Sequence, residues 1–528
     1  MTFLFAFCVT SVNKYSGAEV RLKVKTGTII NAAALFYLMM PIIIFAFGWL
    51  KTGYACGITA VLLAAFFFSL KEMADVDIHF DMKQVNIALA VSILVMLWVG
   101  LSGIGEISFQ NSDHEIRNAI FRDLVQNPWP VVYHFSGEQS AQALAGHDGA
   151  LVYYIAYWLP AALAGKLWGW ETANLVLYLW TVLGVLLGMY YLSFFLRKRL
   201  SLIAVVFFIL WSGLDVVGVL LRRYQFITGA HIEWWATYFQ YSSNTTALFW
   251  VFNQTVVPWL VVMLLLNQKN NKNILLFYAL CFPYAPLPFI GLLPFVAYWA
   301  LFRPADLMNE SLQSQSRFLN RLRAFWTQIR PMLTFQNIAV PLALGALISS
   351  YFMVNSYIGN RYHGLIIFIV NSPANLLWCY FLFCILEFGL YASVIFPSCR
   401  KNSIFLITVI SLALIPWYFA GVNNDFVMRA SIPPLLILMT YVLQYLFDGH
   451  NRAAKAFLVF FFIIGAVTPF NEIYRSVLIT SGDYPDRLAD HIQSMSNFKF
   501  IKDVGPFIAI DPEKSVFFKY FGKSIPPK

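Results

Sequence analysis

The chain has 528 residues, of which 59% are hydrophobic and only 12% are charged, and its net charge is +10. Soluble domains are about 25% charged, so this composition excludes a water-soluble enzyme, a disordered chain and a fibrous protein. Continuous apolar runs exclude a β-barrel, whose strands alternate apolar and polar residues. The sequence therefore predicts an all-α polytopic membrane protein. Its positive charge is expected beside the membrane, so no nucleic-acid partner is predicted.

Apolar runs long enough to cross a bilayer, about 20 residues each, are the main signal along the chain. They predict about thirteen spans, at residues 29–50, 54–70, 86–105, 172–196, 200–221, 246–266, 273–283, 287–302, 333–354, 376–398, 403–422, 428–447 and 454–470. The first run is interpreted as a retained signal anchor. The pair 273–283 and 287–302 is short and interrupted by prolines, so it forms either two spans or one hairpin that does not fully cross.

Lysine and arginine indicate the direction of the spans, because they collect on the cytoplasmic side of a membrane. With the N-terminus inside, almost every short basic segment also falls inside, including Arg197 to Arg199, Arg303 to Arg330 and Arg452 to Lys455. Four segments then fall outside, namely 106–171, 222–245, 355–375 and 471–528. We therefore expect a multi-pass membrane protein with a cytoplasmic N-terminus and an external C-terminus.

Two helices are expected to lie along the outer surface of the membrane. Residues 114–125 place Ile120 and Leu124 on one helical face and polar residues on the other. Residues 150–166 are apolar enough to cross, but counting them as a span would put Arg197 to Arg199 outside. We therefore assign them to the outer interface, a depth that suits their aromatic residues.

The chain is expected to divide into a membrane body and a small outer segment. Residues 1–470 form the body, in which 106–171 is the first outer loop. Residues 471–528 are too few to bury the hydrophobic core that an independent domain needs. They are expected to pack on the outer face of the body.

The outer loop begins with a carboxylate at the boundary between membrane and water. Asp113 opens the first surface helix, and Glu115 follows two positions later. A carboxylate at this depth can act as a general base toward a substrate carried on a lipid. The alternative for Asp113 is a helix N-cap, a position that aspartate favours.

Arginines at the outer ends of two predicted spans are candidates for binding a phosphate. Arg222 and Arg223 end one span, and either a phosphate or lipid headgroups would satisfy them. Arg429 opens a late span close to Asp425. It therefore either binds a phosphate, which its planar guanidinium group can contact through two hydrogen bonds, or forms a structural ion pair with Asp425.

Two outer segments hold histidines beside acids. His114 and Glu115, together with His147 and Asp148, are candidates for holding a divalent metal ion, although no HxxxH spacing supports a metal site. The alternative for the pair His147–Asp148 is an exposed loop that caps the next helix.

The second outer segment holds His231 and Glu233, followed by Trp234 and Trp235. The histidine and the acid are candidates for contacting an acceptor. The two indole rings either stack on a sugar or belong to the aromatic belt that marks the membrane interface.

Several short motifs, in order along the chain, resemble those of the GT-C glycosyltransferases. Asp113-x-Glu115 followed by Ala119-Ile120-Phe121-Arg122-Asp123-Leu124 is similar to the acidic start of that superfamily's first outer loop. Gly149 to Trp158 resembles its P-P-L-Y-Y-W helix, and Lys166 to Gly169 resembles the F-K-L-F-G end of that helix. Met428 to Leu435 resembles the R-Y-L-L-P-A-L segment that opens a late span. The resemblance covers much of residues 105 to 450.

The chain also departs from the GT-C pattern. Two extra spans precede the first outer loop, and Gly149 and Ala150 stand where the family has adjacent prolines. The proline-broken hairpin around 283–294 lacks the family's lysine. The sequence therefore indicates a divergent branch, similar to bacterial mannosyltransferases and aminoarabinose-transferase-like proteins.

The resemblance implies a function and, as the location, a bacterial inner membrane. The donor would be a sugar linked to a polyprenyl phosphate, and the acceptor an envelope glycan, a lipid or a protein on the non-cytoplasmic face. Asp113, with Glu115, would supply the catalytic base, and Arg429, with Arg222 or Arg223, would bind the donor phosphate. Two alternatives stay open, a transporter or flippase of lipid-linked cargo and a polymerase or ligase of envelope polysaccharide.

Overall fold

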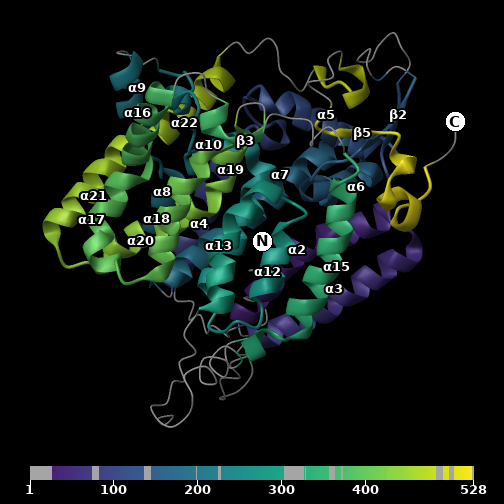
Figure 1. Cartoon of the computed structure of the whole chain (residues 1–528), viewed down its shortest axis with the longest axis horizontal. Helices are drawn as coiled ribbons and strands as arrows, with labels where there is room; N and C mark the ends of the chain where they lie inside the picture. Colours follow the sequence, from purple (N-terminus) through teal and green to yellow (C-terminus); the bar gives the residue numbers. More distant parts are fainter. Residues whose placement is uncertain are drawn as a thin grey trace.

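The computed structural model describes most of the chain. The described residues are 26–73, 82–135, 144, 146–197, 199–223, 228–302, 326, 329–355, 363–369, 373–421, 424–482, 491–498 and 505–525. The described residues exclude the first 25 residues and the side chain of Arg223. They also exclude most of the basic segment 303–330. Within these limits the chain is a predominantly helical, polytopic membrane protein (Figure 1).

The helices carry the labels of Figure 1. In chain order they are α2 (Thr26–Trp49), α3 (Thr52–Glu72), α4 (Met82–Gly100), α5 (Asp113–Gln126), α6 (Leu159–Trp168), α7 (Trp170–Arg197), α8 (Leu202–Ile209), α9 (Asp215–Arg223), α10 (Asn244–Val251), α11 (Val256–Leu266), α12 (Ile274–Cys281), α13 (Pro286–Leu301), α15 (Phe335–Phe352), α16 (Pro373–Cys384), α17 (Leu390–Cys399), α18 (Ser403–Leu414), α19 (Asp425–Ala430), α20 (Ile432–Asp448), α21 (Arg452–Gly465) and α22 (Val467–Ser481). The strands are β1 (Val132–His134), β2 (Asp148–Leu151), β3 (His363–Leu365), β4 (Tyr418–Ala420) and β5 (Ile508–Ile510).

Among the described residues, 8 helical stretches are long and apolar enough to cross a membrane, or 9 if one bent pair counts as a span. The eight are α2, α3, α4, α7, α15, α16 with α17, α19 with α20, and α21 with α22. Each coincides with a run expected from the sequence. The expected total of about thirteen is not reached, because the other runs form shorter or broken helices.

Several of the expected spans form bent, interrupted or short helices. The expected span 246–266 bends by 101° between Asn244–Gln254 and Val256–Leu266. The expected span 200–221 is interrupted between α8 and α9. In the proline-broken pair, α12 has only 8 residues, and the hydroxyl of Tyr284 just beyond it donates to Leu38 O in the middle of α2 at 2.6 Å. The turn between α12 and α13 therefore lies beside the middle of α2.

Burial separates central from peripheral spans. Most of α20 is buried, whereas α3 exposes large apolar side chains such as Leu63, Phe67 and Phe68. A helix that is apolar on all sides and buried lies inside the bundle, while exposed apolar faces suit contact with lipid. Residues of the central helix therefore form the scaffold on which the outer segments rest.

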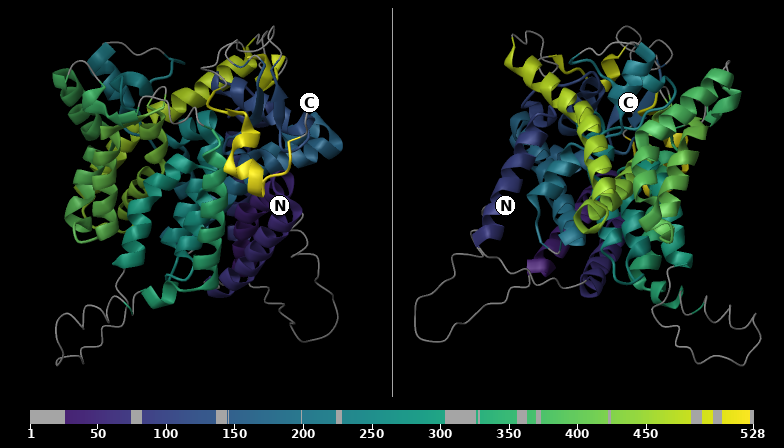
Figure 2. Two further views of the ribbon diagram at one scale, coloured as in Figure 1. Left: turned by 45° about the vertical axis from the view of Figure 1, so that its right-hand side comes forward. Right: turned by 90° about the vertical axis from the view of Figure 1, so that its left-hand side faces the viewer.

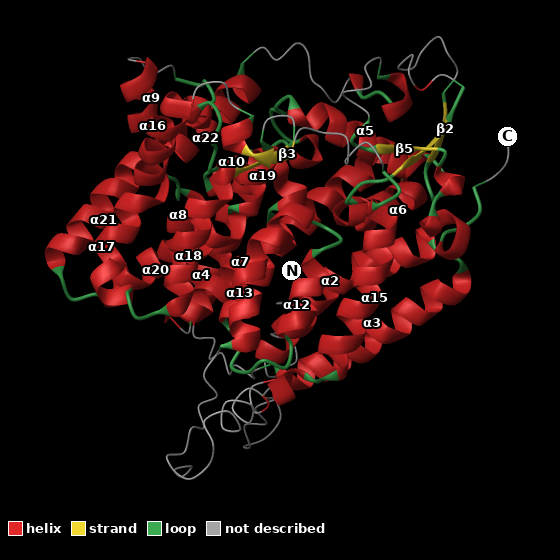
Figure 3. Cartoon of the chain, viewed as in Figure 1, coloured by secondary structure: helices red, strands yellow, loops and turns green. Residues whose placement is uncertain are grey.

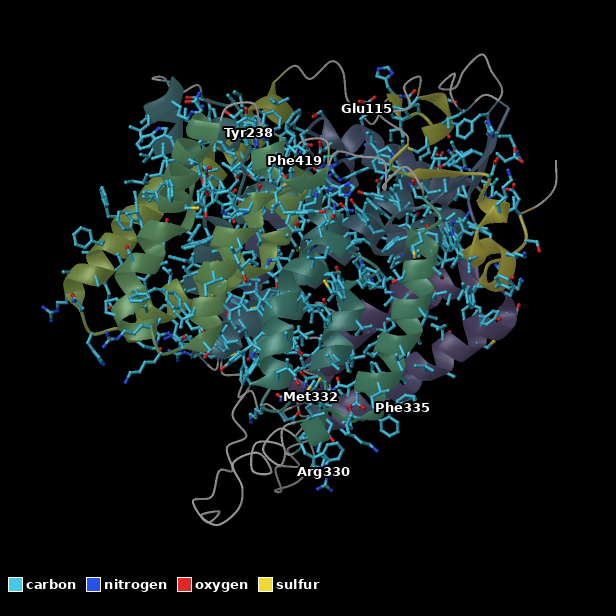
Figure 4. All side chains as sticks on the ribbon, in the orientation of Figure 1. Glu115, Tyr238, Arg330, Met332, Phe335 and Phe419 are labelled. Carbon is cyan, nitrogen blue, oxygen red and sulfur yellow. The ribbon has the colours of Figure 1, made fainter. Side chains whose placement is uncertain are left out.

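The two ends of the bundle differ. Figure 4 shows Glu115, Tyr238 and Phe419 at one end and Arg330 and Phe335 at the other. We call the first of these the site end, and the short strands lie there as well (Figure 3). At the opposite end, ion pairs tie helix ends together, Arg197 to Asp448 at 3.7 Å and Lys272 to Glu72 at 2.7 Å.

The first surface helix is present, but the second is shorter than expected. Helix α5 buries Ile120 and Leu124 on its inner face, as its pattern predicts. The expected helix 150–166 is wrong at its start, because β2 occupies Asp148–Leu151 and α6 begins only at Leu159. A run of apolar residues cannot by itself distinguish a buried strand from a helix.

The strand β2 exists because the end of the chain returns to it. β1, β2 and β5 form an antiparallel sheet in that order, with Ala150 opposite Ala509. Gly149 allows the close approach, since a Cβ atom there would lie 2.6 Å from Ile508 Cγ2 and 2.8 Å from Phe135 Cε2. A second sheet pairs β3 with β4.

The C-terminal segment packs on the body rather than standing apart. Its first part continues the last span, because α22 extends to Ser481, past the expected boundary at residue 470. Farther along, Val152 N–H donates to Phe507 O at 2.8 Å, and Lys523 N–H donates to Trp49 O at 2.8 Å. Figure 2 shows this segment beside the N-terminal helices α2 and α3. A segment too short to build its own core is thus stabilised by the body.

Candidate functional site

A cavity of about 530 Å³ lies at the site end. Its wall is formed by the start of α5, the turn at Tyr153 and Tyr154, the loop 231–240, the end of α10, helix α19 and Pro506 with Phe507 of the C-terminal segment. Titratable side chains from four of these elements reach the cavity. It is therefore the best candidate for a functional site in the part of the chain that the structure describes.

Asp113 lies in this cavity and is not a capping residue. It is the first residue of α5, its own N–H donates to Asn111 Oδ1 at 3.0 Å, and its carboxylate binds Arg117 Nη2 at 2.9 Å. The side chain is 40% exposed. Burial alone would raise the pKa of Asp113, but the charge and hydrogen bond of Arg117, with the charge of Arg429, lower it. Asp113 is therefore a carboxylate at neutral pH.

Arg117 is a site residue that the sequence reasoning missed. Its side chain is only 9% exposed, and it lines the same cavity. Two of its guanidinium nitrogens, Nε and Nη1, are buried and have no hydrogen-bond partner among the described residues. The available signal was the spacing from Asp113, because residues four apart lie on one face of a helix. By the same geometry Glu115, two positions from Asp113, faces elsewhere.

Arg429 lies in the cavity together with its expected ion-pair partner. Its Nη2 is 3.1 Å from Asp425 Oδ1, one turn earlier in α19. Its Nη1 donates to the hydroxyl of Tyr154 at 3.3 Å, and Gln254 Nε2 donates to the same hydroxyl at 2.9 Å. Gln254 stands at the break between α10 and α11, so a bent span helps to position the arginine. Both interpretations of Arg429, phosphate ligand and ion-pair partner, are compatible with this geometry.

The loop between α9 and α10 supplies another part of the wall. His231 lines the cavity, and its Nδ1 is 2.9 Å from Glu472 Oε1 of α22. Glu233 does not line the cavity. Its carboxylate accepts hydrogen bonds from Gln240 Nε2 at 3.1 Å and Ser243 N–H at 2.9 Å. Burial, with the nearby carboxylate of Asp215, raises the pKa of Glu233 to about 7.

The side chains of the adjacent residues Trp234 and Trp235 lie in different surroundings. Trp234 lines the cavity and is 51% exposed, whereas Trp235 is 2% exposed. The indole N–H of Trp235 points into the body, 3.2 Å from Asp215 Oδ1 and 3.1 Å from Glu387 Oε1. Only the first ring can meet a ligand.

Other predicted residues lie apart from the cavity. His114 is buried, with Nε2 3.1 Å from Phe249 O, and burial lowers its pKa to about 4. Glu115 is exposed and is not part of the cavity wall. His147 pairs with Asp511 at 3.3 Å, and Asp148 pairs with His134 at 2.8 Å, so both belong to the β1–β2–β5 sheet.

Two further candidate arginines, Arg222 and Arg223, stand at the end of α9. Neither is among the described residues of the cavity wall. Arg222 Nη1 donates to Trp235 O at 3.1 Å and to Thr237 Oγ1 at 3.2 Å, which holds the loop to its helix. The side chain of Arg223 lies outside the described residues. Of the three predicted phosphate ligands, Arg429 alone is part of the described wall.

The histidines and acids of the two outer loops do not converge on a metal site. Within the ranges that the structure describes, no group of three or more His, Cys, Asp or Glu side chains is placed to hold a metal ion. His114 and Glu115 diverge on α5, and His147 and Asp148 find partners elsewhere.

Comparisons of the chain with protein-family models, with curated proteins and with solved structures find no match. The resemblance to GT-C glycosyltransferases stays a prediction from short motifs. Of the residues that carry it, Asp113, Tyr153, Tyr154 and Arg429 meet in one cavity.

Proposed function

We propose that the chain is a GT-C-like membrane glycosyltransferase. It would move a sugar from a polyprenyl-phosphate donor to an envelope glycan, lipid or protein acceptor on the non-cytoplasmic face. The observation that carries the proposal is the meeting of an ionised carboxylate, Asp113, with the guanidinium groups of Arg117 and Arg429 in one cavity at the end of the bundle.

The proposed step is a displacement at the anomeric carbon. Asp113 accepts the proton of the acceptor hydroxyl as its oxygen attacks that carbon. The bond from the anomeric carbon to the phosphate oxygen breaks, and the polyprenyl phosphate leaves with the bonding electron pair. Arg429, which Tyr154 orients, stabilises the charge on the leaving phosphate.

Arg117 has a supporting role in this mechanism. Its contact at 2.9 Å keeps Asp113 ionised and in place. A base with a lowered pKa is weaker, but it is already deprotonated at neutral pH. Asp113 can then take the proton late in the reaction. By that point the acceptor oxygen has largely bonded to the anomeric carbon, which makes its proton acidic.

We further propose that the cavity faces away from the cytoplasm. The support is the positive-inside rule applied to short basic turns such as Arg400–Lys401 and Arg452–Lys455. Single cysteines introduced at residues 115 and 400 of a cysteine-free chain test this orientation. We expect an impermeant maleimide to label 115 in intact cells and 400 only after permeabilisation. The reverse pattern would refute it.

The decisive experiment compares sugar transfer with and without the protein. Envelope glycans from cells with and without the chain are analysed by mass spectrometry, and full-length protein in nanodiscs is then given radiolabelled polyprenyl-phosphate sugars and membranes. We expect one sugar to be lost from the glycans and transferred again in vitro. Unchanged glycans with altered distribution of the lipid-linked donor across the membrane would instead indicate a flippase.

A further inference from the structure

Another part of the cavity wall, outside α19, contains three aromatic rings. His231, Trp234 and Trp250 come from the loop 231–240 and from the end of α10. The ring centroid of His231 lies 4.9 Å from that of Trp234 and 4.8 Å from that of Trp250, with the planes inclined at 74° and 46°. Trp234 and Trp250 are inclined at 62°. We call these three rings the cup; Trp234 lines the cavity and is 51% exposed, whereas His231 and Trp250 are half-buried.

Each ring of the cup is fixed by a hydrogen bond at its polar atom. Trp234 Nε1 donates to Gln240 Oε1 at 2.9 Å, and Trp250 Nε1 donates to Glu472 Oε2 at 3.2 Å. Glu472 also holds His231 Nδ1 at 2.9 Å. The cup is therefore rigid before any ligand enters, which lowers the entropic cost of binding.

The acids around the cup are already neutralised. Glu472 is paired with both Arg475, at 3.1 Å, and His231, at 2.9 Å. Glu233 lies behind Gln240, and burial favours its neutral form. Arg475 also lies over the ring of Trp250, 5.3 Å from the centroid. A cationic ligand would find no free carboxylate here, so the cup is better suited to a neutral one.

We propose that Trp234, with His231 and Gln240, forms the subsite that binds a neutral sugar ring of the acceptor. The C–H face of a pyranose stacks on the exposed indole of Trp234, which is 51% exposed. Its hydroxyl groups reach Gln240 Oε1, which accepts from Trp234 Nε1 and keeps a second lone pair, and His231 Nε2, which lies 3.5 Å from Gln240 Nε2. The other wall, with Arg429 and Tyr154, is left for the donor phosphate, so Asp113 lies in the cavity that both substrates share. This assignment rests on the proposed function.

The test measures sugar binding separately from sugar transfer. Full-length protein in nanodiscs is titrated with neutral methyl glycosides, and contact is detected by saturation-transfer difference NMR. Trp234→Ala removes the stacking face and is expected to weaken binding about three- to tenfold. Trp234→Phe should retain most of the affinity. The control is Trp378→Ala, since Trp378 is 72% exposed on α16 and is not part of the cavity wall.

The outcomes separate this proposal from the proposed function. Weaker glycoside binding in Trp234→Ala alone, with unfolding temperature unchanged, supports the subsite even if no transfer is found. Equal binding by wild type and Trp234→Ala overturns it, even if transfer depends on Asp113. Binding of tetramethylammonium that is tighter than that of every glycoside and is lost in Trp234→Ala also overturns it, in favour of a cation site.

Discussion

Arg429 donates a hydrogen bond from Nη1 to the hydroxyl of Tyr154, 275 positions earlier in the chain. The tyrosine belongs to the first outer loop, and the arginine belongs to the helix that opens a late span. This contact joins two of the segments whose short motifs resemble those of GT-C glycosyltransferases. It also gives the arginine a fixed direction within the cavity, which a lone ion pair with Asp425 would not require.

Replacing Asp113 by asparagine should slow transfer by about 10²–10⁴-fold. Asparagine keeps the shape of the side chain but cannot accept the proton. Donor binding should persist, because Arg429 is unchanged. The measurement is the initial rate of sugar transfer beside donor binding in nanodiscs. Asp148→Asn is the matched control, since its carboxylate binds His134 at 2.8 Å and does not line the cavity. Full transfer by Asp113→Asn would remove the base assignment.

Arg429→Ala should weaken donor binding about tenfold to a hundredfold, the cost of losing a charged hydrogen bond. Arg222→Ala provides the comparison, because that guanidinium binds Trp235 O and Thr237 Oγ1 outside the cavity wall. It should leave donor affinity within about twofold. Equilibrium binding of a fluorescent polyprenyl phosphate measures both. If donor affinity is equal in wild type and Arg429→Ala, the arginine has only its structural role beside Asp425.

Gly149→Val should detach β5 from β2. The new side chain would enter space held by Ile508 Cγ2 and Phe135 Cε2, at 2.6 and 2.8 Å from the Cβ position, and such overpacking costs about 1–3 kcal/mol. Hydrogen exchange at residues 508–510 should accelerate, and transfer should fall because Phe507 leaves the cavity wall. Ile510→Thr, at the exposed end of β5, is the control. Unaltered exchange in Gly149→Val would show that the sheet tolerates the larger residue.

His231 should make stability depend on pH. Burial alone would lower the pKa of His231, but the hydrogen bond to Glu472 and the nearby Glu233 outweigh burial and the opposing charge of Arg475, so the pKa is raised. A raised pKa stabilises the fold fully below the unfolded value of about 6.5, and this contribution is lost as pH rises through the folded pKa.

The corresponding measurement is thermal unfolding in nanodiscs. The unfolding temperature of wild type should exceed that of His231→Gln by more at pH 6 than at pH 9. Trp378→Ala, which replaces an exposed residue of α16 and leaves His231 and its partners unchanged, should follow the wild-type pH profile. If the unfolding temperatures of wild type and His231→Gln differ by the same amount at pH 6 and at pH 9, protonation of His231 does not contribute to stability.

Apolar length was sufficient to predict the long spans, because a helix that crosses a bilayer needs an uninterrupted apolar run. It could not predict β2, since residues 148–151 become a strand only by pairing with residues 508–510, which lie far along the chain. It also could not predict that 246–266 bends by 101°, where buried Asn253 and Gln254 interrupt the apolar run.

The site was predicted in part for similar reasons. Asp113, His231 and Arg429 are in the cavity wall, as expected of polar residues beside span ends. Arg117 was missed because its role depends on the helix beginning at Asp113, which sets the face that both residues share. Arg222 is not in the described cavity wall, because its guanidinium group donates to Trp235 O, and a sequence does not show which neighbour accepts a hydrogen bond at a helix end.

The pairing of β5 with β2 also orders events during synthesis. A ribosome delivers residues 505–510 after the described spans of the body, so the cavity lacks the wall formed by Pro506 and Phe507 until those residues have been made. A nascent chain halted before this point could be fully inserted and still have an open, unfinished site. Delivery of residues 505–510, rather than insertion of the spans, is then the event that completes this part of the cavity wall.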